Sequence, residues 1–208
     1  LQYEPSIYAT MKDWVIETIK IFKDYNKAGL IIRIHPAEIR RYSTSREPLL
    51  EIIEKNFPEG LPPNIKIINA SENHSTYRLS EICTAAIIFG TKTGLELSAR
   101  GIPVIVCGEA WIKDKNISFD PKTKEEYENL LKIGNLEMNS IMKERALRFA
   151  YHFFERTALE LPFLGSISGN LTLTIDEKNI DIIANGKNQV LEKISDEIET
   201  YTGYFIGG

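Results

Sequence analysis

Short apolar runs alternate with amphipathic stretches over the first two thirds of the chain. Three of these runs are almost unbroken, as in strands buried on both faces, and cover residues 30–34, 85–89 and 103–107. A fourth, at residues 65–70, alternates between apolar and polar residues. Helices are predicted before, between and after them at residues 11–25, 47–57, 75–83, 93–100, 124–134 and 140–161. This alternation predicts an α/β fold with a Rossmann-like, doubly wound parallel sheet and helices on both faces.

Local signals support several of these helices. In residues 11–25 an apolar stripe runs on one face, opposite lysine and aspartate; its members are Trp14, Val15, Thr18, Ile19 and Phe22. Thr123 and Glu126 have the spacing of a capping box, and Gly101 is placed to end the helix of residues 93–100.

The pattern changes at Gly165. Beyond it the sequence predicts two short strands around a turn and a final helix. We therefore expect a domain at residues 1–164 and a C-terminal appendage at residues 165–208.

Composition and charge restrict the function. The 208 residues carry a formal net charge of −4, so nothing attracts the chain as a whole to nucleic acid, and no nucleic-acid partner is expected.

Cys83 and Cys107 lie in apolar segments, which favours reduced thiols in a cytoplasmic protein. No apolar stretch approaches the roughly 18 residues of a membrane span. Because the sequence begins with Leu1 and not methionine, we expect a fragment of a longer chain.

Unusual polar residues follow each predicted strand. In open α/β sheets, ligands bind beyond the carboxyl ends of the strands. The most informative of these segments is Gly-Thr-Lys-Thr-Gly at residues 90–94, because glycines allow close approach of the backbone and a helix start offers free N–H groups. Hydroxyls from Thr91 and Thr93 and the charge of Lys92 would suit a phosphate. The segment is not a P-loop, and no GxGxxG is present.

Structural explanations compete with this hypothesis. Thr93 and Glu96 have capping-box spacing, which would explain both without a ligand. His35, followed by proline at a strand end, could be a structural histidine, and Glu38 an ordinary loop charge. Arg33 is harder to explain in this way, because a charge within a buried strand must find a carboxylate or a phosphate.

The three histidines show no metal-ligand spacing and no Asp-x-Asp is present, so no metal is expected. No cofactor is expected either.

Several segments occur in an order that resembles a known family. They are "LIIRIHPAE", "LPPNIKII", "STYRLSE", "GTKTGLELSARGIPVIVCGEAWIKDK" and "EEYENLL". Over residues 1–131 the chain resembles the C-terminal half of bacterial capsular polysaccharide biosynthesis proteins, which are similar to GT-B glycosyltransferases. The His-Pro and Thr-Gly-x-Glu elements together make the resemblance fairly specific.

The resemblance implies that residues 1–164 bind a nucleotide-sugar donor without a metal. It implies that His35 and residues 91–93 contact the donor phosphate, that Glu96 accepts hydrogen bonds from the ribose, and that Glu109 and Trp111 line the cleft. The general base and the site for a saccharide or lipid-linked acceptor would belong to a domain that precedes this chain. The candidate substrate-binding residues are Arg33, His35, Glu38, Thr91, Lys92, Thr93, Gly94, Glu96 and Glu109.

Two other classes of function stay open, one enzymatic and one not. The same fold would serve a nucleotide-sugar 2-epimerase or a polyol-phosphate transferase, and a module that binds a nucleotide or a partner without catalysis would need only the fold. The expected location is the cytoplasm, with peripheral association at the inner face of the membrane left open.

Overall fold

The computed structural model describes residues 7–39, 47–156, 158, 161, 164–166, 173–175, 181 and 187–200. The chain divides into two compact units, Leu1–Leu147 and Arg148–Gly208. The domain boundary expected near residue 165 stays a prediction.

The strands of the first unit form two parallel pairs. β1 (Leu30–Arg33) pairs with β2 (Ile65–Ile68), and β3 (Ala86–Ile88) pairs with β4 (Val104–Val106). A parallel bridge from Ile105 to Phe119 extends the second pair. All four strands lie in the predicted runs. The fold is mixed α/β, as expected, but the described strands form separate pairs and not one continuous sheet.

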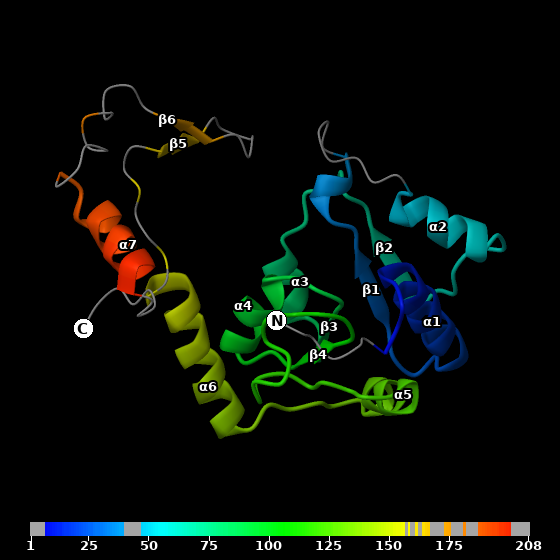
Figure 1. Ribbon diagram of the computed structural model, residues 1–208. Helices are drawn as coiled ribbons and strands as arrows, with labels where there is room; N and C mark the ends of the chain where they lie inside the picture. Colours follow the sequence, from blue (N-terminus) through cyan, green and yellow to red (C-terminus); the bar gives the residue numbers. More distant parts are fainter. Residues whose placement is uncertain are drawn as a thin grey trace. The chain divides into compact units, whose positions relative to one another are not determined.

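Helices connect and cover these pairs. Their bounds are α1 (Met11–Asp24), η1 (Pro36–Ile39), α2 (Leu49–Asn56), α3 (Thr76–Glu81), α4 (Thr93–Ala99) and α5 (Lys124–Lys132), with η1 a 3₁₀ turn. α1 packs on α2 and β2, and α4 packs on β3 and β4 (Figure 1). Each parallel pair is thus joined by a crossover that contains a helix, as parallel strands require.

Local sequence signals explain where several helices begin and end. Thr10 precedes α1, and its Oγ1 accepts a hydrogen bond from the Asp13 N–H at 3.1 Å. Thr123 does the same for α5, accepting from the Glu126 N–H at 3.1 Å, as predicted. Gly101, with φ of +79°, follows α4 in the left-handed conformation that suits glycine.

One apolar cluster includes side chains from both strand pairs. Leu30 and Ile65 belong to it together with Ile105 and Cys107, and the predicted stripe of α1 packs into it. The Trp14 ring lies 5.6 Å from the Phe89 ring at the end of β3. Helix α1 therefore contributes to a core that both pairs share.

A chain of hydrogen bonds joins α1 to α5 inside this core. Trp14 Nε1 donates to the Tyr127 hydroxyl at 3.1 Å, and this hydroxyl lies 2.7 Å from Thr18 Oγ1. Thr18 Oγ1 in turn donates to the Trp14 carbonyl at 2.7 Å. Tyr127 is fully buried, and the loss of solvation raises its pKa well above the ordinary value.

The long helix predicted from about Ser140 to Leu161 is present as far as Arg156, with a change of helix type within it. α6 (Ser140–Tyr151) ends at Tyr151 and is followed by a π-helical segment, η2 (His152–Arg156).

The second unit also contains an antiparallel pair and a helix. β5 (Leu164–Ser166) pairs with β6 (Leu173–Ile175). α7 (Gln189–Thr200) begins after Asn188, whose Oδ1 accepts from the N–H groups of Val190 and Leu191.

Candidate functional site

The carboxyl ends of β3 and β4 meet at one edge. A Cβ added to Gly90 would lie 2.5 Å from the Glu109 carbonyl oxygen, and one added to Gly108 would overlap the Phe89 carbonyl. The two segments that follow these strands therefore run side by side. This arrangement brings residues 91–94 and Glu109, all predicted site residues, to the same edge.

The turn after β3 presents polar groups to solvent. Thr91 and Lys92 are exposed, and Thr93 is half-buried. Thr91 Oγ1 accepts a hydrogen bond from the Thr93 N–H at 3.3 Å, so this hydroxyl faces the start of α4. Among the described residues, the N–H groups of Thr91 and Lys92 have no hydrogen-bond partner. Two N–H donors, a hydroxyl and an ammonium group are thus available within three residues.

The capping-box explanation for this turn is wrong. Thr93 is the first residue of α4, and the carboxylate of Glu96 does not return to the helix start. Instead, Glu96 Oε2 accepts a hydrogen bond of 2.6 Å from the Tyr77 hydroxyl on α3, which raises the pKa of Tyr77. The Arg100 guanidinium lies over the Tyr77 ring, 4.3 Å from its centroid. These three side chains join α3 to α4.

The glycines of the turn have structural roles of their own. Gly94 is buried, and an added Cβ would overlap Ile88 and approach Ile112 Cδ1 to 3.0 Å. Gly90 is needed for the close approach of the segment after β4. Their presence is therefore explained by packing and does not by itself indicate a ligand.

The residues predicted around β1 form a second group, at the end of the other pair. His35 is exposed, and its carbonyl accepts a hydrogen bond from the Glu38 N–H at 3.0 Å. Glu38 Oε2 accepts from the Leu49 N–H at 3.1 Å, so this carboxylate caps the start of α2. Glu38 is neither an ordinary loop charge nor free to bind a ligand with this oxygen.

Arg33 has no carboxylate partner among the described residues. Its guanidinium donates to three backbone carbonyls, those of Ile34 at 2.9 Å, Asn69 at 2.6 Å and Glu72 at 3.1 Å. Its Nε is buried without a hydrogen-bond partner. Arg33 therefore holds the loop after β2 against the end of β1, since backbone carbonyls can take the place of a carboxylate when they converge on one guanidinium.

Sequence reasoning missed Lys113. This residue follows β4 and is only 9% exposed, and its side chain has no hydrogen bond or ion pair within the described part of the chain. Its neighbour Ile112 packs against Gly94, which places this segment beside the start of α4. A packed lysine stem holds its ammonium group at low entropic cost. Nothing in the sequence distinguishes Lys113 from Lys115, which is exposed.

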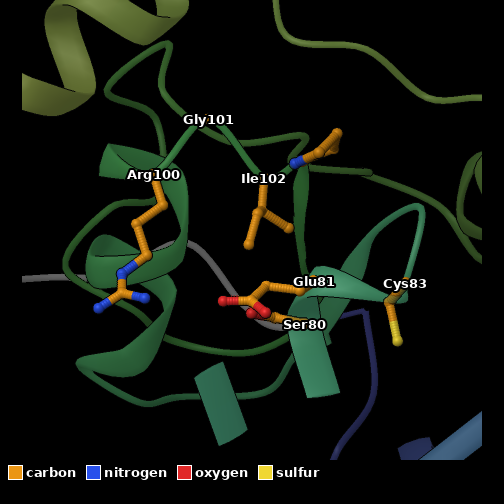
Figure 2. A pocket seen from close by; sticks show the side chains of 7 residues that line it. Ser80, Glu81, Cys83, Arg100, Gly101 and Ile102 are labelled. Carbon is orange, nitrogen blue, oxygen red and sulfur yellow. The ribbon is translucent and has the colours of Figure 1, made fainter. Parts of the chain in front are cut away.

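Two pockets lie elsewhere in the first unit. One, of about 480 Å³, is lined by Ser80, Glu81, Cys83 and residues 100–103, where α3 and α4 end (Figure 2). The other, of about 390 Å³, is lined by Asn73, His74, Ser75, Arg78 and Leu79 at the start of α3. None of the nine predicted site residues lines either pocket.

Other features bear on the class of the site. Cys83 and Cys107 are free thiols. No cluster of histidine, cysteine, aspartate or glutamate in the described ranges has the arrangement of a metal site. Within the same ranges, no helix has the length and apolar character needed to cross a membrane.

Comparisons with known proteins do not add to this picture: no family model, no curated protein and no solved structure matches the chain.

Proposed function

We propose that the first unit binds the nucleotide-sugar donor of a glycosyltransferase that builds a capsular or other surface polysaccharide. In this proposal the two parallel pairs belong to one Rossmann-like layer of a GT-B domain. The apolar cluster that includes residues of both pairs supports this architecture, as does the parallel direction within each pair.

The observation that carries the proposal is the set of donors at the edge of β3 and β4. The N–H groups of Thr91 and Lys92 have no partner among the described residues, and the ammonium groups of Lys92 and Lys113 belong to segments that run side by side. A phosphate needs N–H donors and positive charge, and this edge supplies both. The two lysines would favour a diphosphate.

The same groups would serve the reaction. Glycosyl transfer leaves negative charge on the departing nucleotide, and donors fixed in advance around its phosphates stabilise the transition state. Lys92 and Lys113 would supply the positive charge here. Glu96, held at one oxygen by Tyr77, keeps its other oxygen for a ribose hydroxyl.

One observation fits the non-catalytic alternative as well as the catalytic one. Gly90, Gly94 and Glu38 have packing or capping roles that need no ligand. A module that binds a nucleotide or a partner without catalysis would contain them equally. Binding experiments separate a nucleotide-binding protein from a partner-binding one.

The test is calorimetric titration of the 208-residue chain with CMP, CDP, UDP and GDP. We expect one nucleotide to bind, and Lys92→Ala to weaken its affinity about fivefold, because a charge-assisted hydrogen bond to phosphate at an exposed site contributes about 1 kcal/mol. Lys27→Ala is the matched control. It removes the same charge from an exposed position before β1, outside the segments that follow β3 and β4.

If no nucleotide binds, or if Lys92→Ala and Lys27→Ala bind with equal affinity, the phosphate site at residues 91–93 is wrong.

A further inference from the structure

The chain after β4 forms a compact loop, residues 107–118, whose two ends lie together. Phe119, which follows the loop, joins β4 through two backbone hydrogen bonds of 2.8 and 2.9 Å. Within the loop, Ile112 and Ile117 are each 1% exposed, so the loop is packed against the rest of the first unit. Compact loops with adjacent ends often carry functional side chains.

One carboxylate holds the middle of this loop. Asp120 Oδ2 accepts a hydrogen bond from the Asp114 N–H at 2.8 Å, and its Oδ1 accepts from the Ser118 hydroxyl at 2.7 Å. Between these donors the chain turns through Asp114 and Asn116, with φ of +59° and +55°. This left-handed conformation is unfavourable for residues with a Cβ, so contacts must hold it. Loss of solvation raises the pKa of Asp120, and the two hydrogen bonds act against this change.

Lys113 lies in the part of the loop that Asp120 holds. It is 9% exposed, and its side chain has no hydrogen bond or ion pair within the described ranges. Burial raises the pKa of Cys107 to about 12, and the charge of Lys113 acts in the opposite direction, so the ammonium group lies near the end of β4. A lysine charge buried to this extent is unfavourable without an anion beside it, which favours an anionic ligand.

We propose that Asp120 is a positioning residue of the nucleotide site. By holding the turn at Asp114, it keeps the ammonium group of Lys113 at the edge of β3 and β4, where the phosphates of the nucleotide would bind. This role rests on the proposed function, because it concerns the same phosphate site. A carboxylate repels phosphate, so Asp120 acts through the loop and not by contact. An ammonium group that is fixed in advance loses less freedom on binding.

The test is calorimetric titration of the 208-residue chain with the nucleotide that binds most tightly among CMP, CDP, UDP and GDP. Asp120→Asn should weaken binding about threefold, because the amide keeps only one acceptor oxygen and the loop no longer fixes Lys113. Asp114→Asn is the matched control. It removes the same charge from the same loop and keeps the backbone N–H that donates to Asp120.

The two substitutions separate positioning from electrostatics. Removal of a carboxylate near a phosphate site favours anion binding, so on charge alone both variants should bind the nucleotide as tightly as the wild type or more tightly. We expect this result for Asp114→Asn. Only a positioning role makes Asp120→Asn bind more weakly.

A double-mutant cycle with Lys113→Ala separates positioning from a general loss of stability. Lys113→Ala should weaken binding about tenfold, the effect of losing a charge-assisted hydrogen bond, and adding Asp120→Asn should not weaken it further. Ser118→Ala removes only the hydrogen bond to Oδ1 and should weaken binding about twofold. If urea unfolding shows that Asp120→Asn does not fold, Ser118→Ala decides, and wild-type affinity in that variant overturns the role of Asp120.

The outcomes distinguish this role from the proposed function. If no nucleotide binds, or if Lys92→Ala and Lys27→Ala bind with equal affinity, the proposed function fails and the role of Asp120 fails with it. If Lys92→Ala weakens binding but Asp120→Asn binds as tightly as Asp114→Asn, the nucleotide site stands and the role of Asp120 is wrong. The role is also wrong if Asp120→Asn has the same effect with and without Lys113.

Discussion

The hydrogen-bond chain between α1 and α5 allows a quantitative test of the core. Tyr127→Phe removes one hydroxyl and keeps the ring. In the wild type, Trp14 Nε1 donates to this hydroxyl at 3.1 Å, and the hydroxyl lies 2.7 Å from Thr18 Oγ1. Because Thr18 Oγ1 uses its hydrogen for the Trp14 carbonyl, the Tyr127 hydroxyl must be the donor to Thr18.

The expected loss in the free energy of unfolding follows from the number of hydrogen bonds that Tyr127→Phe removes. Two hydrogen bonds at a net of about 1 kcal/mol each are lost, and the indole N–H of Trp14 keeps only the Cys107 sulfur, a weak acceptor, as a neighbour in a half-buried position. Together these losses should lower the free energy of unfolding by about 2–3 kcal/mol. Tyr25→Phe is the control, because its hydroxyl makes one exposed bond of 3.3 Å and should contribute less than about 0.5 kcal/mol.

Urea unfolding monitored by tryptophan fluorescence measures both variants. The tryptophans Trp14 and Trp111 both belong to the first unit, so the signal reports its unfolding. A Tyr127→Phe variant within about 0.5 kcal/mol of the wild type would show that this hydrogen-bond chain does not hold α1 to α5.

Two further predictions test the packing at β3 and β4. Gly90→Ala should destabilise the first unit by about 1–3 kcal/mol, because the new Cβ would lie 2.5 Å from a backbone carbonyl oxygen. The control Gly134→Ala has open space around it and should stay within about 0.5 kcal/mol of the wild type in the same urea assay. Equal stability of the two variants would contradict the close approach at Gly90. Iodoacetamide at pH 8 should label half-buried Cys83 in the native protein and leave Cys107 unmodified, as detected by peptide mass spectrometry. Burial raises the pKa of Cys107 to about 12, so only roughly one Cys107 thiol in ten thousand is ionised at this pH. Rapid native labelling of Cys107 would show that the chain directly after β4 is not buried as described.

Sequence patterns predicted the elements whose formation depends on neighbouring residues. The stripe of α1 and the cap of α5 at Thr123 follow from spacings of three and four residues, and both are confirmed. The four strands lie where the apolar runs place them. Register and sheet continuity do not follow from such runs, because they depend on how distant segments pack.

The partners of the predicted site residues were less accessible to sequence reasoning. Glu38 caps a helix that begins eleven residues later, Glu96 bonds to Tyr77 on another helix, and Arg33 bonds to carbonyls of a distant loop. Each contact joins segments that only tertiary packing brings together. Lys113 is the opposite case, a site residue that the sequence did not suggest. A lysine in a loop becomes a candidate for phosphate binding only when its burial is known.

The most direct test of the account is a crystal structure of the chain with the nucleoside diphosphate that binds it most tightly. We expect phosphate oxygens within about 3 Å of the Thr91 and Lys92 N–H groups, with the ammonium groups of Lys92 and Lys113 beside them. Phosphates bound elsewhere, for example in the pocket lined by Ser80 and Arg100, with residues 91–93 facing only solvent, would contradict it.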